Sequence, residues 1–310
     1  MMKKYLKKAF WVLLLSGLFA GSAVWTGLRS ENEKKAGRLV FANAIQKFHE
    51  LALINIETPS LKVSLALEDN LWRVREADNY FADYALINRL FDNIRSAAYT
   101  GKTKEITDSE NGLTTRIILS GKDGNLLNNV AFVSKNREYY IKSTDNKASF
   151  ISAGFQFPTT LASWVKQPIL AVEPGRILSV AVGDGEAVRP ETGLPFSVKT
   201  AQRTKEIRLD GLFNSLRYVP AEKVLSVQNF DETRYSENKT LTLTTYDGLI
   251  TGLNTFKNGE NYFLKITLSA TNLPTTETSD YIKNNAFLYD GWYFQISPVI
   301  GSKLFNFALE

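Results

Sequence analysis

The chain has 310 residues, of which 44% are hydrophobic and 22% charged; this composition is typical of a folded protein and excludes a disordered chain. The net charge is +5, but five of the 37 basic residues precede residue 30 and no acidic residue does. The remaining basic residues balance the 32 acidic ones, so we expect no nucleic-acid partner. The absence of cysteine excludes disulfides, thiolate metal sites and cysteine nucleophiles.

An uncharged apolar segment runs from Ala9 to Leu28, and four lysines precede it. At 1.5 Å per residue in a helix, this segment spans about 30 Å, the thickness of a bilayer core. Positively charged flanks remain in the cytoplasm. We therefore predict a cytoplasmic basic tail over residues 1–8 and a transmembrane helix over residues 9–28, with the bulk of the chain outside the cytoplasm.

A cleaved signal peptide is the alternative interpretation of the same segment. Gly21, Ser22 and Ala23 form a small-residue stretch that could serve as a cleavage site. The apolar run continues through Val24 and Trp25, which favours an uncleaved anchor. Both interpretations place the rest of the chain beyond the membrane, and neither allows a lipid anchor on cysteine.

A charged juxtamembrane segment over residues 29–50 is followed by alternating apolar and polar residues. This alternation predicts strands over residues 52–57, 61–67 and 71–75, with turn residues between them. The next element is a predicted helix that begins near Asp83, a candidate cap. Its expected apolar face is made of Tyr84, Ile87, Leu90, Phe91 and Ile94.

The second half of the chain repeats the pattern of the first half, which is the most informative feature of the sequence. Four blocks recur in the same order at offsets of 122 to 124 residues: Ile87–Arg95 with Leu209–Arg217, Ile117–Gly124 with Leu241–Gly248, Glu138–Lys142 with Asn261–Lys265, and Trp72–Arg75 with Phe196–Lys199. The repeated unit is predicted to run strand, strand, helix, strand, strand, strand.

This pattern predicts an α+β fold in which a transmembrane helix precedes two tandem repeats over residues 51–165 and 166–310. Each repeat should be a mostly antiparallel sheet packed with one amphipathic helix, because the helix must bury its apolar stripe against its own sheet. The segment Trp164–Pro174 should link the repeats. The aromatic strand Trp292–Ile296 should close the second sheet or cross to the first.

The sequence shows no assembled catalytic set, so we predict no catalytic, cofactor-binding or metal-binding residues. The single histidine, His49, has no nucleophile signature beside it and is best explained as structural. Asp123 and Asp247 are equivalent in the two repeats, and each precedes a glycine, which favours hairpin turns over paired catalytic carboxylates. The run from Gly183 to Glu186 is likewise explained by a hairpin turn.

Aromatic residues on the predicted strands are the remaining candidates for an interaction surface. Adjacent residues on a strand point to opposite faces, so one ring of each pair could face outward. Packing inside the protein is the alternative. The six candidates are Tyr139, Tyr140, Tyr262, Phe263, Trp292 and Tyr293.

A set of motifs follows in chain order: Leu71–Val74 at a strand, Ala82–Tyr84 opening a helix that contains Leu90 and Phe91, and Ser163–Val165 ahead of Ile169–Leu170 and Arg176–Ile177. Together these motifs resemble the envelope family catalogued as domain of unknown function 4340. The resemblance covers about residues 38–300. The sequence departs from it at Phe81, where proline is more usual, and at Phe196, which replaces tryptophan in the second repeat.

This resemblance implies a tethered protein of the bacterial inner membrane, encoded beside components of an uncharacterised or gliding-type ABC transport system. The expected function is a non-enzymatic accessory or scaffold subunit whose partner is a membrane protein such as the transporter permease. A binding module for a glycan or lipid, held between the repeats, is the alternative. A hydrolase that works with carboxylates alone is a third hypothesis.

Overall fold

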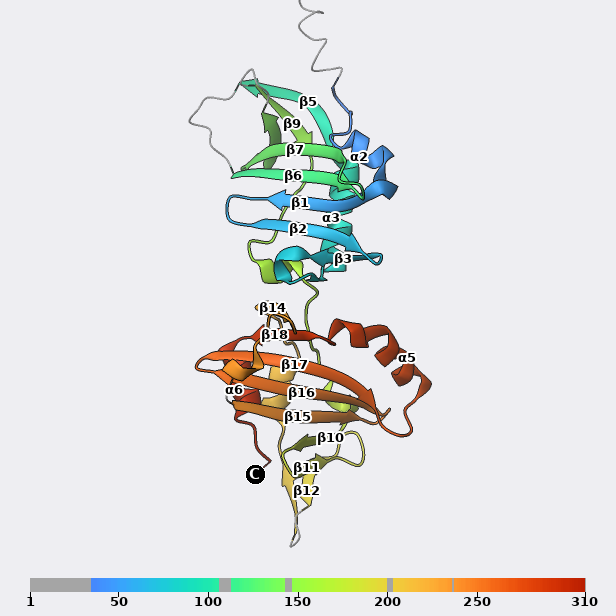
Figure 1. Cartoon of the computed structure of the whole chain (residues 1–310), viewed down its shortest axis with the longest axis vertical. Helices are drawn as coiled ribbons and strands as arrows, with labels where there is room; N and C mark the ends of the chain where they lie inside the picture. The colour runs from blue at the N-terminus through green and yellow to red at the C-terminus, as the bar shows by residue number, and fades with distance from the viewer. Residues whose placement is uncertain (1–34, 106–112, 143–146, 200–202, 236, 310) are drawn as a thin grey trace, which may run out of the picture. The chain divides into compact units, whose positions relative to one another are not determined.

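The computed structural model describes residues 35–105, 113–142, 147–199, 203–235 and 237–309. The described residues form two large antiparallel sheets with few helices, which confirms the α+β class at this level (Figure 1). No helix in these ranges is long and apolar enough to cross a bilayer. The predicted membrane helix over residues 9–28 lies outside them.

The first sheet has nine strands in the order β4-β3-β2-β1-β6-β7-β8-β9-β5. Its strands are β1 (Leu51–Glu57), β2 (Lys62–Glu68), β3 (Leu71–Val74), β4 (Tyr80–Phe81), β5 (Ala98–Glu105), β6 (Leu113–Gly121), β7 (Leu126–Lys135), β8 (Glu138–Lys142) and β9 (Lys147–Ser152). Two helices accompany them, α2 (Ala42–Gln46) and α3 (Tyr84–Ser96).

The second sheet also has nine strands, in the order β13-β12-β11-β10-β15-β16-β17-β18-β14. Its strands are β10 (Ile177–Val182), β11 (Gly185–Val188), β12 (Phe196–Lys199), β13 (Thr204–Ile207), β14 (Lys223–Ser226), β15 (Glu237–Thr245), β16 (Leu249–Asn258), β17 (Asn261–Ala270) and β18 (Trp292–Ile296). Its helices are α4 (Asp210–Leu216), α5 (Thr276–Asn285) and α6 (Pro298–Phe305).

The two strand orders are identical once the strands are renumbered from β1 and from β10. The four aligned blocks of the sequence fall on equivalent elements: α3 and α4, β6 and β15, β8 and β17, β3 and β12. The predicted unit has five strands, however, whereas each sheet has nine; in the first sheet β4, β5 and β9 were not predicted. The placement predicted for Trp292–Ile296 needs a correction, because β18 lies inside the second sheet, between β17 and β14.

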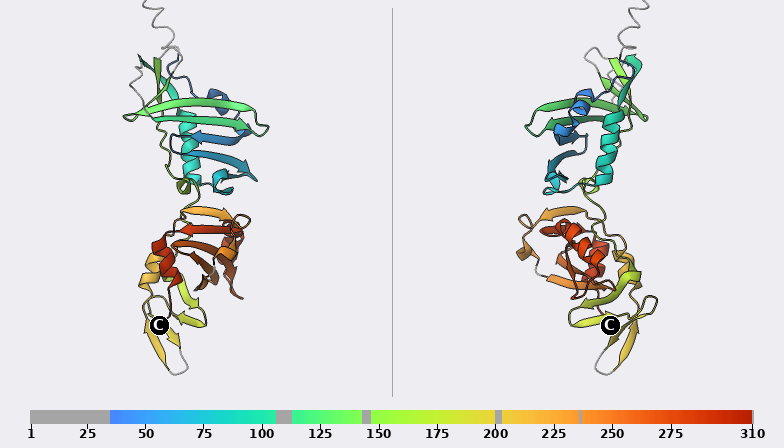
Figure 2. Two further views of the ribbon diagram at one scale, coloured as in Figure 1. Left: turned by 60° about the vertical axis from the view of Figure 1, so that its left-hand side comes forward. Right: turned by 90° about the vertical axis from the view of Figure 1, so that its right-hand side faces the viewer.

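Helix α3 begins as the sequence predicts, because the Oδ1 atom of Asp83 accepts a hydrogen bond of 2.9 Å from the backbone N–H of Leu86. Its buried residues differ from the predicted face at two positions, one of which is Phe91, which is only partly buried. Tyr84 is 45% exposed and Leu86 is buried in its place, beside Ile87. Figure 2 shows α3 against one face of the first sheet.

Residues of the chain group into two compact units that do not coincide with the sequence repeats. Among the described residues, one unit comprises those up to Lys62 together with those of 87–157, and the second comprises Val63–Leu86 together with those that follow residue 157. The segment Val63–Leu86 of the first repeat thus packs within the second unit.

Tyr80 anchors this segment in the second unit. Its ring is 1% exposed and meets the rings of Trp292 and Phe294 edge-on, at centroid distances of 5.1 and 5.4 Å. Its hydroxyl donates a hydrogen bond of 3.1 Å to the carbonyl of Leu288. Burial raises the pKa of Tyr80, so the phenol stays neutral and remains a donor. The carboxylate of Asp78 adds a bond of 3.0 Å from the N–H of Ser226.

Helix α6 packs on β15, β16 and β17 and lies against α4. The contact is close because Gly301 sits over the ring of Tyr262: a Cβ atom built on Gly301 would lie 2.2 Å from the Cγ atom of Tyr262. The helix starts at Pro298, and the hydroxyl of Ser297 accepts from the N–H of Ile300 at 3.4 Å. This helix therefore covers one face of the second sheet.

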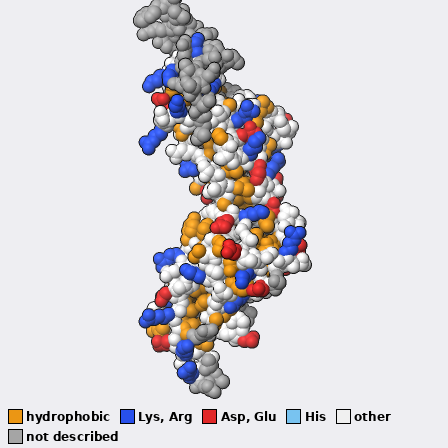
Figure 3. Space-filling view, turned by 90° about the vertical axis from the view of Figure 1, so that its left-hand side faces the viewer, with side chains coloured by type: hydrophobic (Ala, Val, Ile, Leu, Met, Phe, Trp, Pro, Cys, Tyr) orange, Lys and Arg blue, Asp and Glu red, His pale blue; other side chains and the backbone are white. Residues whose placement is uncertain are grey.

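On the face in Figure 3, basic and acidic side chains are interspersed over the described residues and apolar side chains lie between them. That face shows no extended region of basic side chains among the described residues, which is what binding to a nucleic-acid phosphate backbone would require.

The close contact at Gly301 predicts opposite effects for two helix glycines. Gly301→Ala should lower the free energy of unfolding by about 1–3 kcal/mol, because the new methyl group collides with Tyr262. Gly211→Ala in α4 should raise it by about 0.5–1 kcal/mol, since no atom lies within 4 Å of its Cβ position. Urea unfolding of both variants measures this. A neutral or stabilising effect of Gly301→Ala would contradict the close packing.

Candidate functional site

The two candidate aromatic residues in the first unit are buried. Tyr139 is 9% exposed and contacts Phe132 at a centroid distance of 6.0 Å. Tyr140 is 5% exposed and packs with Val133 and Ala148. Neighbouring residues of β8 are thus buried on both faces of the sheet.

In the second unit, Tyr262, Phe263 and Tyr293 are 7%, 5% and 0% exposed. Tyr262 packs under α6, whereas Phe263 and Tyr293 lie under Phe230 on the other face. The Phe230 ring stacks on Tyr293 at 3.9 Å and lies 5.0 Å from the Phe263 ring. The expected outward surface is therefore corrected to core packing, because a separate segment covers each face.

Trp292 differs from the other five candidates because it is only partly buried. Its ring meets Tyr80 at 5.1 Å and Phe81 at 6.3 Å, so it helps to hold the segment Val63–Leu86. The remaining exposed part of Trp292 lines a shallow polar groove with residues such as Asn79 and Asn229.

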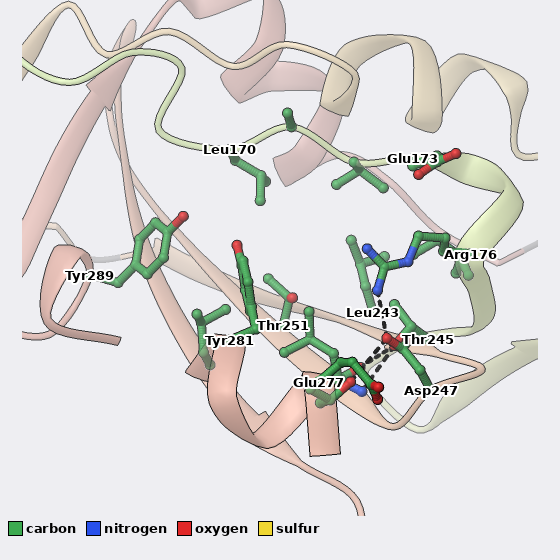
Figure 4. Close-up of a pocket in the computed structure, with 16 residues that line it drawn as sticks. Leu170, Glu173, Arg176, Leu243, Thr245, Asp247, Thr251, Glu277, Tyr281 and Tyr289 are labelled. Carbon is green, nitrogen blue, oxygen red and sulfur yellow. Dashed lines mark hydrogen bonds and ion pairs between the residues drawn. The ribbon is translucent and has the colours of Figure 1, made fainter. Parts of the chain in front are cut away.

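A pocket of ≈ 390 Å³ lies elsewhere in the second unit, and we take it as the candidate functional site (Figure 4). Three elements build it: the loop over residues 170–177, the strands β15 to β17, and the inserted helix α5. A pocket of this size with apolar lining and convergent polar groups is the usual form of a ligand site.

One wall of the pocket comes from a segment that has no counterpart in the first repeat. Only residues 143–146 separate β8 from β9, whereas residues 271–291 separate the equivalent strands β17 and β18. This inserted segment contains α5 and contributes Glu277, Thr278, Tyr281 and Tyr289 to the lining. The pocket is therefore a feature of the second repeat.

Asp247 holds the inserted helix and the 170–177 loop together. Its Oδ2 atom accepts a hydrogen bond of 2.5 Å from Arg176 Nη2 and one of 2.9 Å from Thr278 Oγ1. Burial acts to raise the pKa of Asp247, but hydrogen bonds from Thr245, Thr278 and Arg176 outweigh it and lower the pKa to about 2. The carboxylate thus stays ionised at neutral pH.

The equivalent turn of the first repeat lacks the ion pair between Arg176 and Asp247. The N–H of Tyr246 donates to the carbonyl of Arg176 at 3.1 Å, and the N–H of Lys122 donates in the same way to the carbonyl of Glu50 at 3.2 Å. Glu50 therefore occupies the position of Arg176, and Asp123 that of Asp247. Two acids cannot form an ion pair, so the contact exists in the second repeat only.

His49 lies beside this equivalent position in the first unit. Its Nε2 atom is 3.8 Å from the Oε1 atom of Glu50, and its side chain is 79% exposed. This exposed location agrees with the structural role expected for the single histidine.

A buried arginine forms hydrogen bonds to the turn that contains Arg176. Arg189 is 8% exposed, and its Nη2 atom donates to the carbonyls of Pro174 at 2.6 Å and Ile177 at 2.8 Å. Its guanidinium group lies 4.6 Å from the centre of the Phe196 ring. These bonds order the 3₁₀ turn Pro174–Arg176, which sets the direction of the Arg176 side chain.

Two tyrosines form the opposite wall of the pocket, as Figure 4 shows. Burial raises the pKa of Tyr289 above its ordinary value, and the charge and side-chain hydrogen bond of Tyr281 act in the same direction. Tyr289 therefore presents a neutral phenol to the pocket. Tyr281 itself is 43% exposed and lies at the rim.

The arrangement offers little for hydrolysis or metal chemistry. Asp123 and Asp247 belong to different units, and the lowered pKa of Asp247 is the opposite of what a general acid needs. Within the described ranges, no group of three or more His, Cys, Asp or Glu residues could hold a metal ion. The run at Gly183 is a turn between β10 and β11, as predicted, with a φ of 56° at Gly183.

The sequence singled out Asp247 only as a hairpin-turn residue and indicated none of its partners. Arg176, Thr251, Thr278, Tyr281 and Tyr289 were not predicted as site residues. The available signal was the extra length between the aligned strands β17 and β18, which marks where the second repeat departs from the first.

Comparison with protein-family models, curated proteins and solved structures finds no match for this chain. The resemblance to the envelope family catalogued as domain of unknown function 4340 therefore stays a prediction.

The depressed pKa of Asp247 predicts a stability change in acid. A carboxylate with a folded pKa of about 2 stabilises the folded state above its ordinary pKa of 3.8, and this stabilisation is lost as the pH falls toward 2. Asp247→Asn should cost about 1 kcal/mol at neutral pH, a value discounted for solvent screening, and less near pH ~2.

Urea unfolding at both pH values measures this difference. Asp123→Asn, at the equivalent turn of the first repeat, is the matched control and should change little. A loss for Asp247→Asn that does not depend on pH would contradict the ion-pair assignment.

Proposed function

We propose that this chain is a non-enzymatic, membrane-anchored envelope protein that serves as an accessory or scaffold subunit of a transport system. Its N-terminus lies in the cytoplasm of a bacterial cell, and the two units lie beyond the inner membrane. The uncharged run Ala9–Leu28 behind four lysines and the electrically balanced remainder of the chain support this topology.

The observation that carries the partner-binding role is the exposed apolar surface of the inserted segment 271–291. Leu273 is 91% exposed and Phe287 is 42% exposed. Helix α5 buries a single residue, Thr278, so it contributes little to the core of its own unit. Apolar side chains presented in this way mark protein-interaction sites.

A membrane protein is the partner that best fits this surface. The anchor confines the chain to the bilayer, where a transporter permease offers an extracytoplasmic face within reach. The resemblance to a family encoded beside gliding-type ABC components supports the same choice.

The hydrolase hypothesis has less support. Asp247, the most enclosed acid of the pocket, is bound to Arg176 and Thr278 and has a lowered pKa. A carboxylate held in this way does not exchange protons at neutral pH. The glycan or lipid hypothesis requires exposed aromatic rings that contact the ligand, and five of the six candidate rings are buried.

A change at Leu273 tests the docking role. Leu273→Asp should reduce recovery of the membrane-protein partner about tenfold, because a charge at an apolar contact removes on the order of 1–3 kcal/mol of binding. The measurement is a pull-down of the full chain from detergent-solubilised membranes, with quantitative mass spectrometry.

Leu126→Asp is the matched control, because Leu126 is also an exposed leucine, at 59%, and belongs to the other unit. It should leave recovery unchanged. Failure of the unaltered chain to retain a membrane protein at near-native levels would refute the proposed function.

The proposed transmembrane anchor leads to a separate prediction about the mature chain. Intact mass spectrometry should find residues 1–28 retained, and alkaline carbonate should leave the protein in the membrane while detergent releases it, because about 30 Å of apolar helix stays in the bilayer. A mature chain that begins after Ala23 and washes free would establish the cleaved signal peptide instead.

A further inference from the structure

We propose that the pocket of the second unit binds a small organic cation, namely a protonated amine on an apolar body that carries one further hydrogen-bonding group. This inference goes beyond the docking role of the exposed segment 271–291, since it concerns the interior of the pocket.

The floor of the pocket fits an apolar body. The apolar lining comes from three neighbouring strands and from the loop: Leu243, Leu249 and Leu268 of the strands, and Leu170 and Val172 of the loop. Figure 4 shows Leu170 and Leu243 on opposite sides of the pocket. The volume of ≈ 390 Å³ lies within the range of about 300–1,000 Å³ for sites that enclose small molecules. A ligand of one ring and a short chain would bury most of its surface here.

The charges around the opening favour a cation. Arg176 is the one basic residue among the described residues that line the pocket, and its charge is already committed to Asp247 at 2.5 Å. Glu173 and Glu277 line the rim from the loop and from α5, and both are exposed. The rim therefore presents two carboxylates without a basic partner in the lining, and like charges disfavour an anion there.

Thr251 supplies a polar group at the floor. It is 7% exposed and lies on β16 between Leu243 and Leu268 of the flanking strands. Thr251 lines the pocket, whereas the hydroxyl of Thr245 bonds to Leu249 and that of Thr278 bonds to Asp247. A hydroxyl that opens onto the pocket can form a hydrogen bond with a ligand there.

The two tyrosines complete the match. Tyr281 and Tyr289 line the pocket, and an aromatic ring attracts an organic cation through its π-face. The pocket thus combines carboxylates at the rim, aromatic rings at the side and a hydroxyl at the floor. This combination favours a ligand with a protonated amine at one end and a polar group at the other.

Four related probes test this selection: tyramine carries both groups, tyrosol lacks the charge, 4-hydroxyphenylacetate reverses the charge, and phenethylamine lacks the hydroxyl. Binding is measured by calorimetry on the full chain in phosphatidylcholine nanodiscs, with empty nanodiscs as the blank. Tyramine should bind saturably, about tenfold more tightly than tyrosol or 4-hydroxyphenylacetate, and more tightly than phenethylamine.

Variants assign the effects to residues. Glu173→Gln with Glu277→Gln should weaken tyramine about tenfold, whereas Glu186→Gln with Glu191→Gln, an equal change of net charge at exposed positions away from the pocket, should not. Thr251→Val should abolish the preference for tyramine over phenethylamine, because it removes the hydroxyl and keeps the side-chain shape.

Three results would overturn the inference: no saturable binding of tyramine, equal binding of all four probes, or tightest binding of the carboxylate, which would indicate an anion held by Arg176. Equal weakening by the two glutamine pairs would also count against the site. Leu273→Asp should retain tyramine binding, so the loss of a protein partner and the loss of the ligand are separate results.

Discussion

Burial of both faces of a wide sheet is the constraint on which the rest of this structure depends. A nine-stranded antiparallel sheet carries more apolar surface than one short helix covers, so other segments must be recruited. In the second sheet, α6 covers Tyr262 on one face, and Phe230 covers Phe263 and Tyr293 on the other. Covering both faces explains why adjacent aromatic residues of one strand are buried together.

The two repeats share one strand order, and the differences between them that matter for the pocket lie at two places. The strand orders agree throughout, yet Arg176 stands where the first copy has Glu50, and residues 271–291 stand where the first copy has a short connection. These two differences meet at Asp247, whose equivalent in the first repeat is Asp123. In the second repeat this hairpin turn therefore holds the wall of a pocket in place.

The chemistry that we propose for that pocket is ligand recognition. Its central carboxylate is bound by Arg176 and Thr278 and keeps a low pKa, so it supports the wall and does not transfer protons. The polar groups left over are Glu173 and Glu277 at the rim and Thr251 at the floor. The proposed docking surface on the outside of the same insertion gives it two separate uses, one toward a membrane partner and one toward a small cation.

The sequence by itself determined the duplication, the antiparallel α+β character, the cap of α3 at Asp83 and the turns at Asp123 and Asp247, because local periodicity and turn chemistry encode these features. Only the tertiary structure decided that the aromatic pairs are buried, that Tyr80 anchors a segment of the first repeat in the second unit, and that Asp247 meets Arg176 and Thr278. These contacts join residues far apart in the chain, and a strand pattern shows which faces exist without showing what covers each face.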